Sequence, residues 1–459
     1  MSLFKNWFFY FGSLFTLILY LLFPGNVDWI LDQPLLVAKA LESNQLNRWG
    51  DLGIAGGNGT TYGPIPNFFY QILLHTTHNL LIIVLIKTIV SWGVIFASLW
   101  RLSFDLKLKK IGILIALLSP FLYFYNRSLW DNVFLIPISA LFSSAVIRYC
   151  SKRTSNDFIL AAVLAAILFH IHLMATLVIV PGMGILNWLM IKEKDKNLKK
   201  LILVQLLIGV ICWPYLKTLL IAKTLAPYGH PQWAAIFLSP LLGLRLFGYF
   251  GFFEYFSPNF YQFFKGAGKI GIYFLILLTS IGPLYYFLGL KKLFSRTCAL
   301  EKPIRIYFIT VLIMTVLISF KMKLRAHPHY MNASWSIYFC VFWMAFSEGV
   351  ENLKTQRLFK VYSSSMVMLI LTYIAYIQLN SGDRGLHFGP TLINQIEIAK
   401  QLPKSDSLKN INIEVDNFSN FPQRLSVLAE IYGNNNLSIS LRRLIYATPF
   451  PSAKIELTH

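Results

Sequence analysis

Charged residues are scarce in this chain of 459 residues. They make up 13% of it, whereas apolar residues make up 56% and aromatic residues 16%. A soluble domain has roughly 25% charged residues, so this composition excludes an ordinary soluble protein. The apolar residues fall in repeated runs of nearly bilayer-spanning length. This pattern predicts an all-α polytopic membrane protein.

Acidic residues are the scarcer of the two charge types. The chain has 20 aspartates and glutamates against 41 lysines and arginines, a formal net charge of +21. Such an excess occurs in nucleic-acid-binding proteins, but here the basic residues cluster in short loops between apolar runs, as the positive-inside rule expects. We therefore expect no nucleic-acid partner. The modest length and the lack of an endoplasmic-reticulum retrieval signal favour the bacterial inner membrane, with a cytoplasmic N-terminus.

Eleven apolar stretches are predicted to span the membrane. They lie at residues 7–24, 79–99, 111–125, 132–149, 157–169, 172–191, 200–221, 270–290, 304–320, 332–348 and 360–380. On this topology the most basic loops all fall on the cytoplasmic side. Residues 157–191 are predicted as two helices turning at His170-Ile171-His172, because one helix would move the next basic loop outward. The first stretch lacks a small-residue cleavage site and is expected to be a retained anchor.

Paired cysteines and repeats are also missing from the sequence. Cys150, Cys212, Cys298 and Cys340 lie in or beside spans or in a predicted cytoplasmic loop, so they are expected to be free thiols. The sequence has no metal-binding cysteine spacing, internal repeat or low-complexity tract.

Three long segments are expected on the outer face. They are the first loop at 25–78, a loop at 222–269 and the tail at 381–459. Residues 1–380 are predicted to form a catalytic membrane region, and the tail a small extracytoplasmic α/β domain. The loop at 222–269 is aromatic and amphipathic, which fits an interfacial helix or a binding lid.

Two aspartates stand at the start of the first outer loop. Asp28 and Asp32 follow the first span directly, and their spacing places them on one face of a helical turn. A carboxylate at the mouth of a membrane protein is costly unless it has a task. Asp32 precedes Gln33-Pro34 and is equally compatible with a helix-capping role. Further along, a glycine-rich turn leads through Tyr62 into an aromatic run, which fits a ligand-contacting segment or a plain surface loop.

The second outer loop is short and polar. It contains Arg127, Trp130 and Asp131. Arg127 and Asp131 are four residues apart and are compatible with an ion pair. Arg127 is also compatible with binding a phosphate, because guanidinium matches phosphate geometry. Trp130 fits the common role of an interfacial anchor.

A basic cluster on the predicted outer face breaks the positive-inside pattern. It contains Lys323 and Arg325, followed by His329 and Tyr330. Binding of a lipid-linked phosphate or pyrophosphate would account for this exception, as would contact with headgroup phosphates. The outer histidines, which include His170 and His172, do not show zinc-binding spacing, so no metal is predicted.

With these motifs the chain resembles the GT-C superfamily of polyprenyl-phosphate-sugar-dependent glycosyltransferases, in particular bacterial relatives of the protein O-mannosyltransferase and aminoarabinose transferase group. The resemblance covers the layout of the transmembrane region, and its motifs are short. The matching positions are Asp32-Gln33, the stretch from Tyr62 to Tyr70, Arg127 with Asp131, His170 or His172, and His329-Tyr330. Many members have Asp-Glu where this chain has Asp32-Gln33, and many are thought to need no metal.

The resemblance implies an inverting transfer of a sugar from a polyprenyl-phosphate donor to an acceptor hydroxyl on a glycan, lipid or protein. Asp32 would be the general base, with Asp28 as its rival. Arg127, Lys323 and Arg325 would stabilise the departing phosphate, assisted by His329 and Tyr330. Asp131, His170, His172 and Tyr62 are further site candidates. No cofactor is predicted.

Two other classes of protein stay open at the sequence level. An O-antigen ligase or polymerase also uses lipid pyrophosphates at the outer face, but its basic residues would lie in central or late loops. A lipid or solute transporter would show inverted repeats, broken helices and midplane charges. A membrane scaffold would leave the outer charges without a role.

Overall fold

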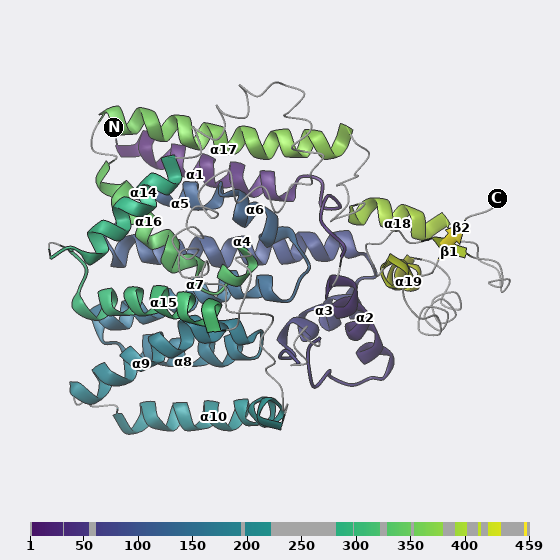
Figure 1. Ribbon diagram of the computed structural model, residues 1–459, viewed down its shortest axis with the longest axis horizontal. Coiled ribbons are helices and arrows are strands. Elements are labelled where there is room, and N and C mark those ends of the chain that lie inside the picture. Colours follow the sequence, from purple (N-terminus) through teal and green to yellow (C-terminus); the bar gives the residue numbers. More distant parts are fainter. Residues whose placement is uncertain are drawn as a thin grey trace.

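The protein is described by a computed structural model that covers residues 2–30, 32–54, 61–193, 198–221, 281–296, 298–321, 328–349, 353–379, 391–401, 412–414, 421–432 and 454–456. The main body contains the helices α1 (Ser2–Leu21), α4 (Leu80–Asp105), α5 (Ile111–Leu117), α6 (Pro120–Arg127), α7 (Leu135–Lys152), α8 (Ser155–Phe169), α9 (Thr176–Lys192), α10 (Leu198–Ile221), α14 (Ile281–Phe294), α15 (Lys302–Lys321), α16 (Trp335–Gly349) and α17 (Leu353–Leu379). Helices α2 (Asp32–Gln45) and α3 (Ile65–Thr76) belong to loop one, and α18 (Leu392–Gln401) and α19 (Phe421–Tyr432) to the tail. Short 3₁₀ turns are η1 (Asn132–Phe134), η2 (Leu173–Ala175) and η4 (Pro328–Met331). The body helices run broadly along the long axis of the molecule (Figure 1).

Helices occupy the predicted spans as far as the structure describes them. Four stretches are long and apolar enough to cross a membrane, at Leu80–Asp105, Asn132–Lys152, Leu173–Lys192 and Leu201–Leu220. This is the architecture of a helical membrane protein. The predicted pair of helices at 157–191 is confirmed, because α8 ends at Phe169 and the chain turns before α9.

The third predicted span is not one continuous helix. Helix α5 ends at Leu117, and Pro120 starts α6. A proline has no N–H and disfavours helical conformation in the residue before it, so the break falls where the sequence requires it. The hydroxyl of Tyr20 donates to the carbonyl of Leu117 at 2.8 Å, which satisfies a helix-end acceptor that the break leaves open.

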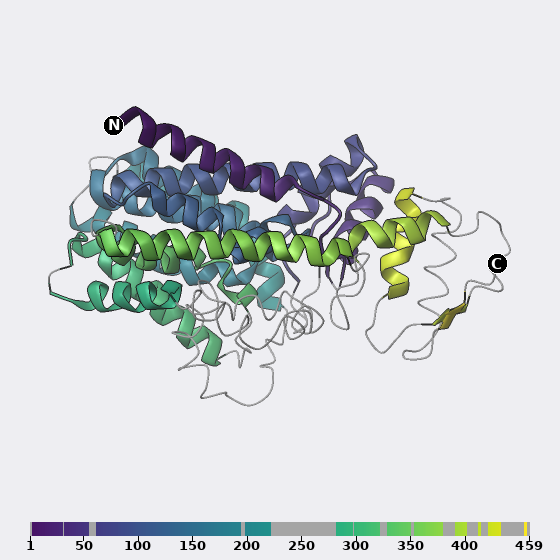
Figure 2. The ribbon, with the colours of Figure 1, turned by 90° about the horizontal axis from the view of Figure 1, so that it is seen from above.

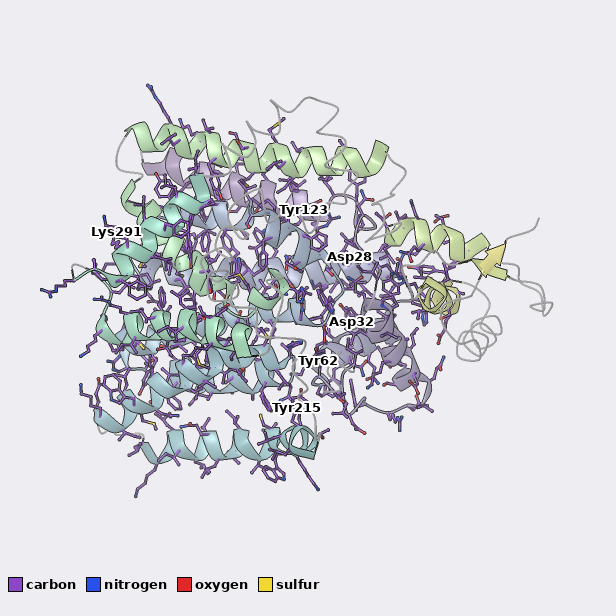
Figure 3. The ribbon with its side chains drawn as sticks, viewed as in Figure 1. Asp28, Asp32, Tyr62, Tyr123, Tyr215 and Lys291 are labelled. Atoms are coloured by element: carbon purple, nitrogen blue, oxygen red, sulfur yellow. The ribbon has the colours of Figure 1, made fainter. Side chains whose placement is uncertain are left out.

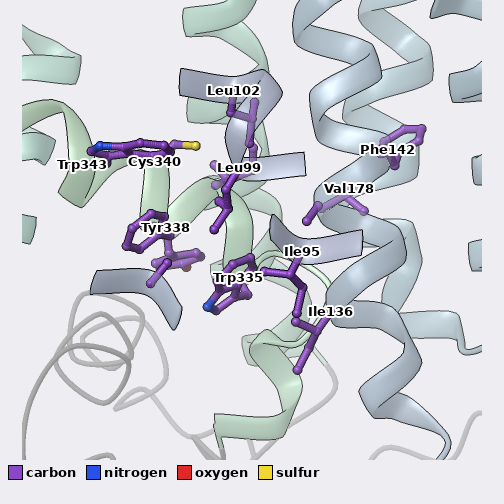
Figure 4. Close-up of a cluster of buried hydrophobic side chains, with 14 of the residues drawn as sticks. Ile95, Leu99, Leu102, Ile136, Phe142, Val178, Trp335, Tyr338, Cys340 and Trp343 are labelled. Atoms are coloured by element: carbon purple, nitrogen blue, oxygen red, sulfur yellow. The ribbon is translucent and has the colours of Figure 1, made fainter. Parts of the chain in front are cut away.

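Helix α7 forms the centre of the body and packs against α4, α8, α9 and α16. Large apolar and aromatic side chains such as Trp335, Tyr338 and Leu99 fill the space between the helices (Figure 4). Serines on α7 allow close approach and add polar contacts between helices. Ser143 Oγ is 3.0 Å from Tyr307 Oη of α15 and accepts from Ser336 Oγ of α16 at 3.3 Å.

One end of the body carries ion pairs between helix termini. Asp157, at the start of α8, lies 3.1 Å from Arg101 of α4 and 3.3 Å from Arg148 of α7. Lys152 of α7 reaches Asp105 of α4 at 3.2 Å. Lys291 lies toward this same end, whereas Asp28, Asp32 and Tyr62 lie toward the other (Figure 3). The ion pairs and the two loop-one residues Asp28 and Asp32 therefore lie toward opposite ends of the body.

Helices α18 and α19 of the tail pack against loop one. Leu392, Ile396 and Leu428 share one buried cluster with Trp29 and Leu36. These helices lie beyond the end of the long helix α17 (Figure 2). The described tail residues form α18, α19 and a short antiparallel pairing of β1 (Asn412–Glu414) with β2 (Lys454–Glu456). The two described tail helices therefore help to build the end of the molecule where the aspartates lie.

Helices α14 and α16 approach each other closely at Gly289. A Cβ atom there would lie 2.0 Å from the backbone oxygen of Val341, so one helix would have to move. We expect Gly289→Ala to lower the free energy of unfolding by about 1–3 kcal/mol, as overpacked cores do. Thermal unfolding of the purified protein in detergent measures this. The matched control is Gly184→Ala in α9, where a Cβ meets no atom within 4 Å; an equal loss in both variants would contradict the prediction.

Candidate functional site

Asp28 lies at the base of loop one and is bound by its neighbour Gln33. The amide nitrogen of Gln33 donates to Asp28 Oδ2 at 2.6 Å and to Ser128 Oγ at 2.9 Å. The amide oxygen of Gln33 accepts from the backbone N–H of Ile30 at 3.2 Å. All three side chains, those of Asp28, Gln33 and Ser128, are buried. One glutamine side chain therefore joins loop one to the second outer loop.

Asp32 is the first residue of α2 and accepts a hydrogen bond from the second outer loop. Its Oδ2 accepts from the indole Nε1–H of Trp130 at 2.9 Å. Burial raises the pKa of Asp32, and the hydrogen bond from Trp130 acts in the opposite direction. The Trp130 ring lies 4.9 Å, centroid to centroid, from the ring of His329 in η4. Trp130 thus connects the loop-one carboxylate to the late outer segment, a role more specific than an interfacial anchor.

Asp131 follows Trp130 and provides a second carboxyl group, which interacts electrostatically with Asp32. Its Oδ1 accepts from the backbone N–H of Asn132 at 2.7 Å and caps η1. Its Oδ2 is buried and has no hydrogen-bond partner within the described part of the chain. Burial, followed by the charge of Asp32, raises the pKa of Asp131 to about 8. At neutral pH the pair therefore consists of a protonated Asp131 and an Asp32 that ionises more readily.

Lys87 is not among the residues predicted from the sequence, although it interrupts an apolar run. It lies in α4 and is fully buried. Its Nζ donates to the carbonyls of Asn126 at 2.8 Å and Tyr125 at 3.2 Å. Asp28 interacts with it electrostatically. An ionisable residue inside a membrane helix is itself a signal of a site, and this one holds the second outer loop beside loop one.

The later part of loop one rests on the turn between α8 and α9. The Tyr62 ring stacks on His172 with centroids 4.0 Å apart, and the backbone N–H of Ile65 donates to the carbonyl of His170 at 3.3 Å. His172 Nδ1 accepts from the backbone N–H of Met174. A Cβ on Gly63 would lie 2.0 Å from the His170 oxygen, so the glycine permits this contact. The structure therefore brings Tyr62 together with His170 and His172.

Arg127 makes hydrogen bonds that hold α6 to the end of α1. Its Nη2 donates to the carbonyls of Leu22 at 2.9 Å and Phe23 at 2.6 Å, and its Nη1 donates to the hydroxyl of Tyr123. Its ion pair with Asp131, one of the two sequence interpretations, is not formed, because Arg127 turns toward the end of α1 instead. Since carbonyls and a hydroxyl occupy its terminal nitrogens, these contacts give no support to phosphate binding by Arg127.

The remaining predicted phosphate ligands are only partly visible. Lys323 and Arg325 lie outside the described residues, as does the predicted loop at 222–269. Tyr330 belongs to η4 next to His329. Within the described ranges no group of three or more histidine, cysteine, aspartate or glutamate side chains is arranged to hold a metal ion.

Searches of protein-family models, curated proteins and solved structures each return no match for this chain. The function therefore has to be argued from the site itself.

The raised pKa of Asp131 makes a prediction about stability. In the unfolded chain an aspartate titrates near pH ~4, whereas folded Asp131 titrates at about 8. Between these values the folded state binds a proton that the unfolded state lacks. The free energy of unfolding therefore falls as pH rises through this window, by up to about 1.4 kcal/mol per unit.

Asp131→Asn should remove this slope while it keeps the acceptor for Asn132. Melting temperatures between about pH 5 and pH 8 should fall less in the variant than in the wild type. The exposed loop-one aspartate provides the control, since Asp51→Asn should keep the wild-type slope. Parallel curves for the wild type and Asp131→Asn would show that Asp131 is not protonated in the folded protein.

Proposed function

We propose that this protein is an integral membrane glycosyltransferase that moves a sugar from a polyprenyl-phosphate donor to an acceptor hydroxyl, with inversion. The observation that carries the proposal is the carboxyl pair of Asp32 and Asp131. Burial keeps Asp131 protonated at neutral pH, whereas Asp32 is half-buried and ionises more readily, and both lie at one end of a bundle of apolar helices. Acid–base chemistry needs such a pair with separated pKa values.

Asp32 takes the proton from the acceptor hydroxyl in this mechanism. The oxygen attacks the anomeric carbon opposite the phosphate, the bond from that carbon to the phosphate oxygen breaks, and polyprenyl phosphate leaves with its electrons. The raised pKa of Asp32 makes it a stronger base than an exposed aspartate. The Oδ2 of protonated Asp131 has no partner in the described structure, so its hydrogen is available to a substrate oxygen.

The departing phosphate gains negative charge and needs cationic neighbours. His329, which contacts Trp130, stands beside the carboxyl pair, and the chain just before it contains Lys323 and Arg325. The apolar surfaces of the helices suit a long isoprenoid tail. On this proposal the site faces the outer side of a bacterial inner membrane and the acceptor is a glycan, a lipid or a protein.

A transporter is the second candidate, and two features favour it. Lys87 is a buried charge inside a membrane helix, and the segment from α5 to α6 is discontinuous at Pro120. Broken helices and buried charges line the substrate sites of transporters. Lys87, however, donates to two backbone carbonyls and interacts electrostatically with Asp28, which is the environment of a structural cation.

The decisive experiment measures release of polyprenyl phosphate by reconstituted protein. A panel of polyprenyl-phosphate sugars supplies the donors and a membrane extract the acceptors. Asp32→Asn should reduce release at least about 100-fold, as loss of a general base does. Asp51→Asn, which changes an exposed carboxylate of the same loop, should leave the rate unchanged. Equal rates for the wild type and Asp32→Asn would remove Asp32 from the reaction.

Asp131 should respond to substitution in a different way from Asp32. An asparagine can accept from Asn132 with its oxygen and donate with its nitrogen, as a protonated carboxyl group does. We expect Asp131→Asn to retain most of the activity, and Asp131→Leu to lose at least ~10-fold because a hydrogen-bond donor is gone. If Asp131→Asn is as inactive as Asp131→Leu, Asp131 acts as a carboxylate instead.

A further inference from the structure

We propose that Arg424 of the tail is a positioning residue for the loop-one acid: its buried charge balances that of Asp28 and so fixes the hydrogen-bonded network that holds Asp32. The inference deepens the proposed function and rests on it for its catalytic consequence. On this inference the tail contributes a residue that positions the site, whereas the sequence alone indicates a separate small domain.

The tail is attached to loop one through backbone contacts. The N–H groups of Leu392 and Ile393 in α18 donate to the carbonyls of Val27 and Gly25 at 2.9 and 3.1 Å. These bonds flank the segment that leads into Asp28. Because backbone bonds fix the course of a loop and do not depend on side-chain identity, α18 sets the position of this segment.

Trp29, next to Asp28, is enclosed by both tail helices. Its indole Nε1–H donates to the carbonyl of Arg424 at 3.2 Å, and its own carbonyl accepts from Gln395 at 3.3 Å. The hydroxyl of Tyr432 accepts from the backbone N–H of Leu80 at 2.7 Å, at the start of α4. The tail thus contacts both the loop that contains Asp28 and the helix that contains Lys87.

Two buried cations, Lys87 and Arg424, act on the Asp28 carboxylate. Arg424 and Asp28 are each 5% exposed, and Lys87 is fully buried. Both cations interact electrostatically with Asp28. Burial lowers the pKa of Arg424 to about 10, and the charge of Asp28 opposes this change, so Arg424 stays protonated at neutral pH. A buried carboxylate is tolerated only with such compensation.

A series of hydrogen bonds connects Asp28 to Asp32 through Gln33, Ser128 and Trp130. Gln33 binds Asp28 and Ser128, and Ser128 Oγ also accepts from the backbone N–H of Trp130 at 3.4 Å. Trp130 donates to Asp32, which is the chain neighbour of Gln33. Displacement of Asp28 therefore displaces Gln33 and, through Ser128, the Trp130 indole that orients the Asp32 carboxylate.

The test is a double-mutant cycle on reconstituted full-length protein. Arg424→Met keeps the volume of the side chain and removes the charge. We expect it to lower kcat at least ~10-fold with little change in KM, since a small misplacement of a catalytic group has such an effect. Arg424→Lys should restore most of the rate. Glu430→Gln, on the same helix at an exposed contact with Gln45, should behave as the wild type.

The second arm of the cycle is Asp28→Asn. If Arg424 acts through Asp28, adding Arg424→Met to Asp28→Asn should lower kcat less than about twofold further. An equal loss in both backgrounds would show that Arg424 only supports the packing of α19, and would overturn the proposal.

Melting temperatures of the same four proteins test the pair without any activity. Each single variant should lower Tm, and the double variant should lose less than the sum, because each change alone leaves a buried charge unpaired. Additive losses would overturn the pairing. If the wild type releases no polyprenyl phosphate but the Tm losses are non-additive, the pairing stands and the proposed transferase function fails.

Discussion

The need to compensate a buried carboxylate governs how this end of the molecule is built. Asp28 is almost inaccessible, and the groups that balance it come from three separate parts of the chain: Gln33 in loop one, Lys87 in a body helix and Arg424 in the tail. In a low-dielectric interior no one of these contacts is dispensable, because an unpaired charge is costly. This requirement favours packing of loop one against α4 and α19. The position of Asp32 follows from this packing, because Gln33, Ser128 and Trp130 connect it to Asp28.

Asp28 and Asp32 consequently have different environments. Asp28 accepts from an amide and interacts electrostatically with two buried cations, which is the environment of a structural charge. Asp32 has one hydrogen-bond donor, the Trp130 indole, and faces a second carboxyl group that burial keeps protonated. The sequence leaves open which aspartate is the base, and this asymmetry of surroundings favours Asp32.

The sequence predicts those features that depend on local pattern. Helices fill the expected ranges as far as the structure describes them, the His170–His172 turn divides two of them, and the helix after Asp32 begins where Gln33-Pro34 indicates. The break at Pro120 was not predicted, since residues 111–125 were assigned to one span, although a proline inside a span disfavours a continuous helix. Contacts between distant segments could not be predicted: Trp29 and Arg424 are 395 residues apart, and no periodicity links them. The contact of Arg127 with the end of α1 could not be predicted either, because the acceptors there are backbone carbonyls, which any residue provides.

Arg424 and Tyr432 follow the described body helices in chain order, so they are synthesised after these helices. The helices can therefore form and pair before the groups that complete the acidic site exist. The charge of Asp28 in loop one is fully balanced only when α18 and α19 have packed against this loop and brought Arg424 into place. The surroundings of Asp28 are thus completed only after α18 and α19 have been synthesised, later than the body helices that they join.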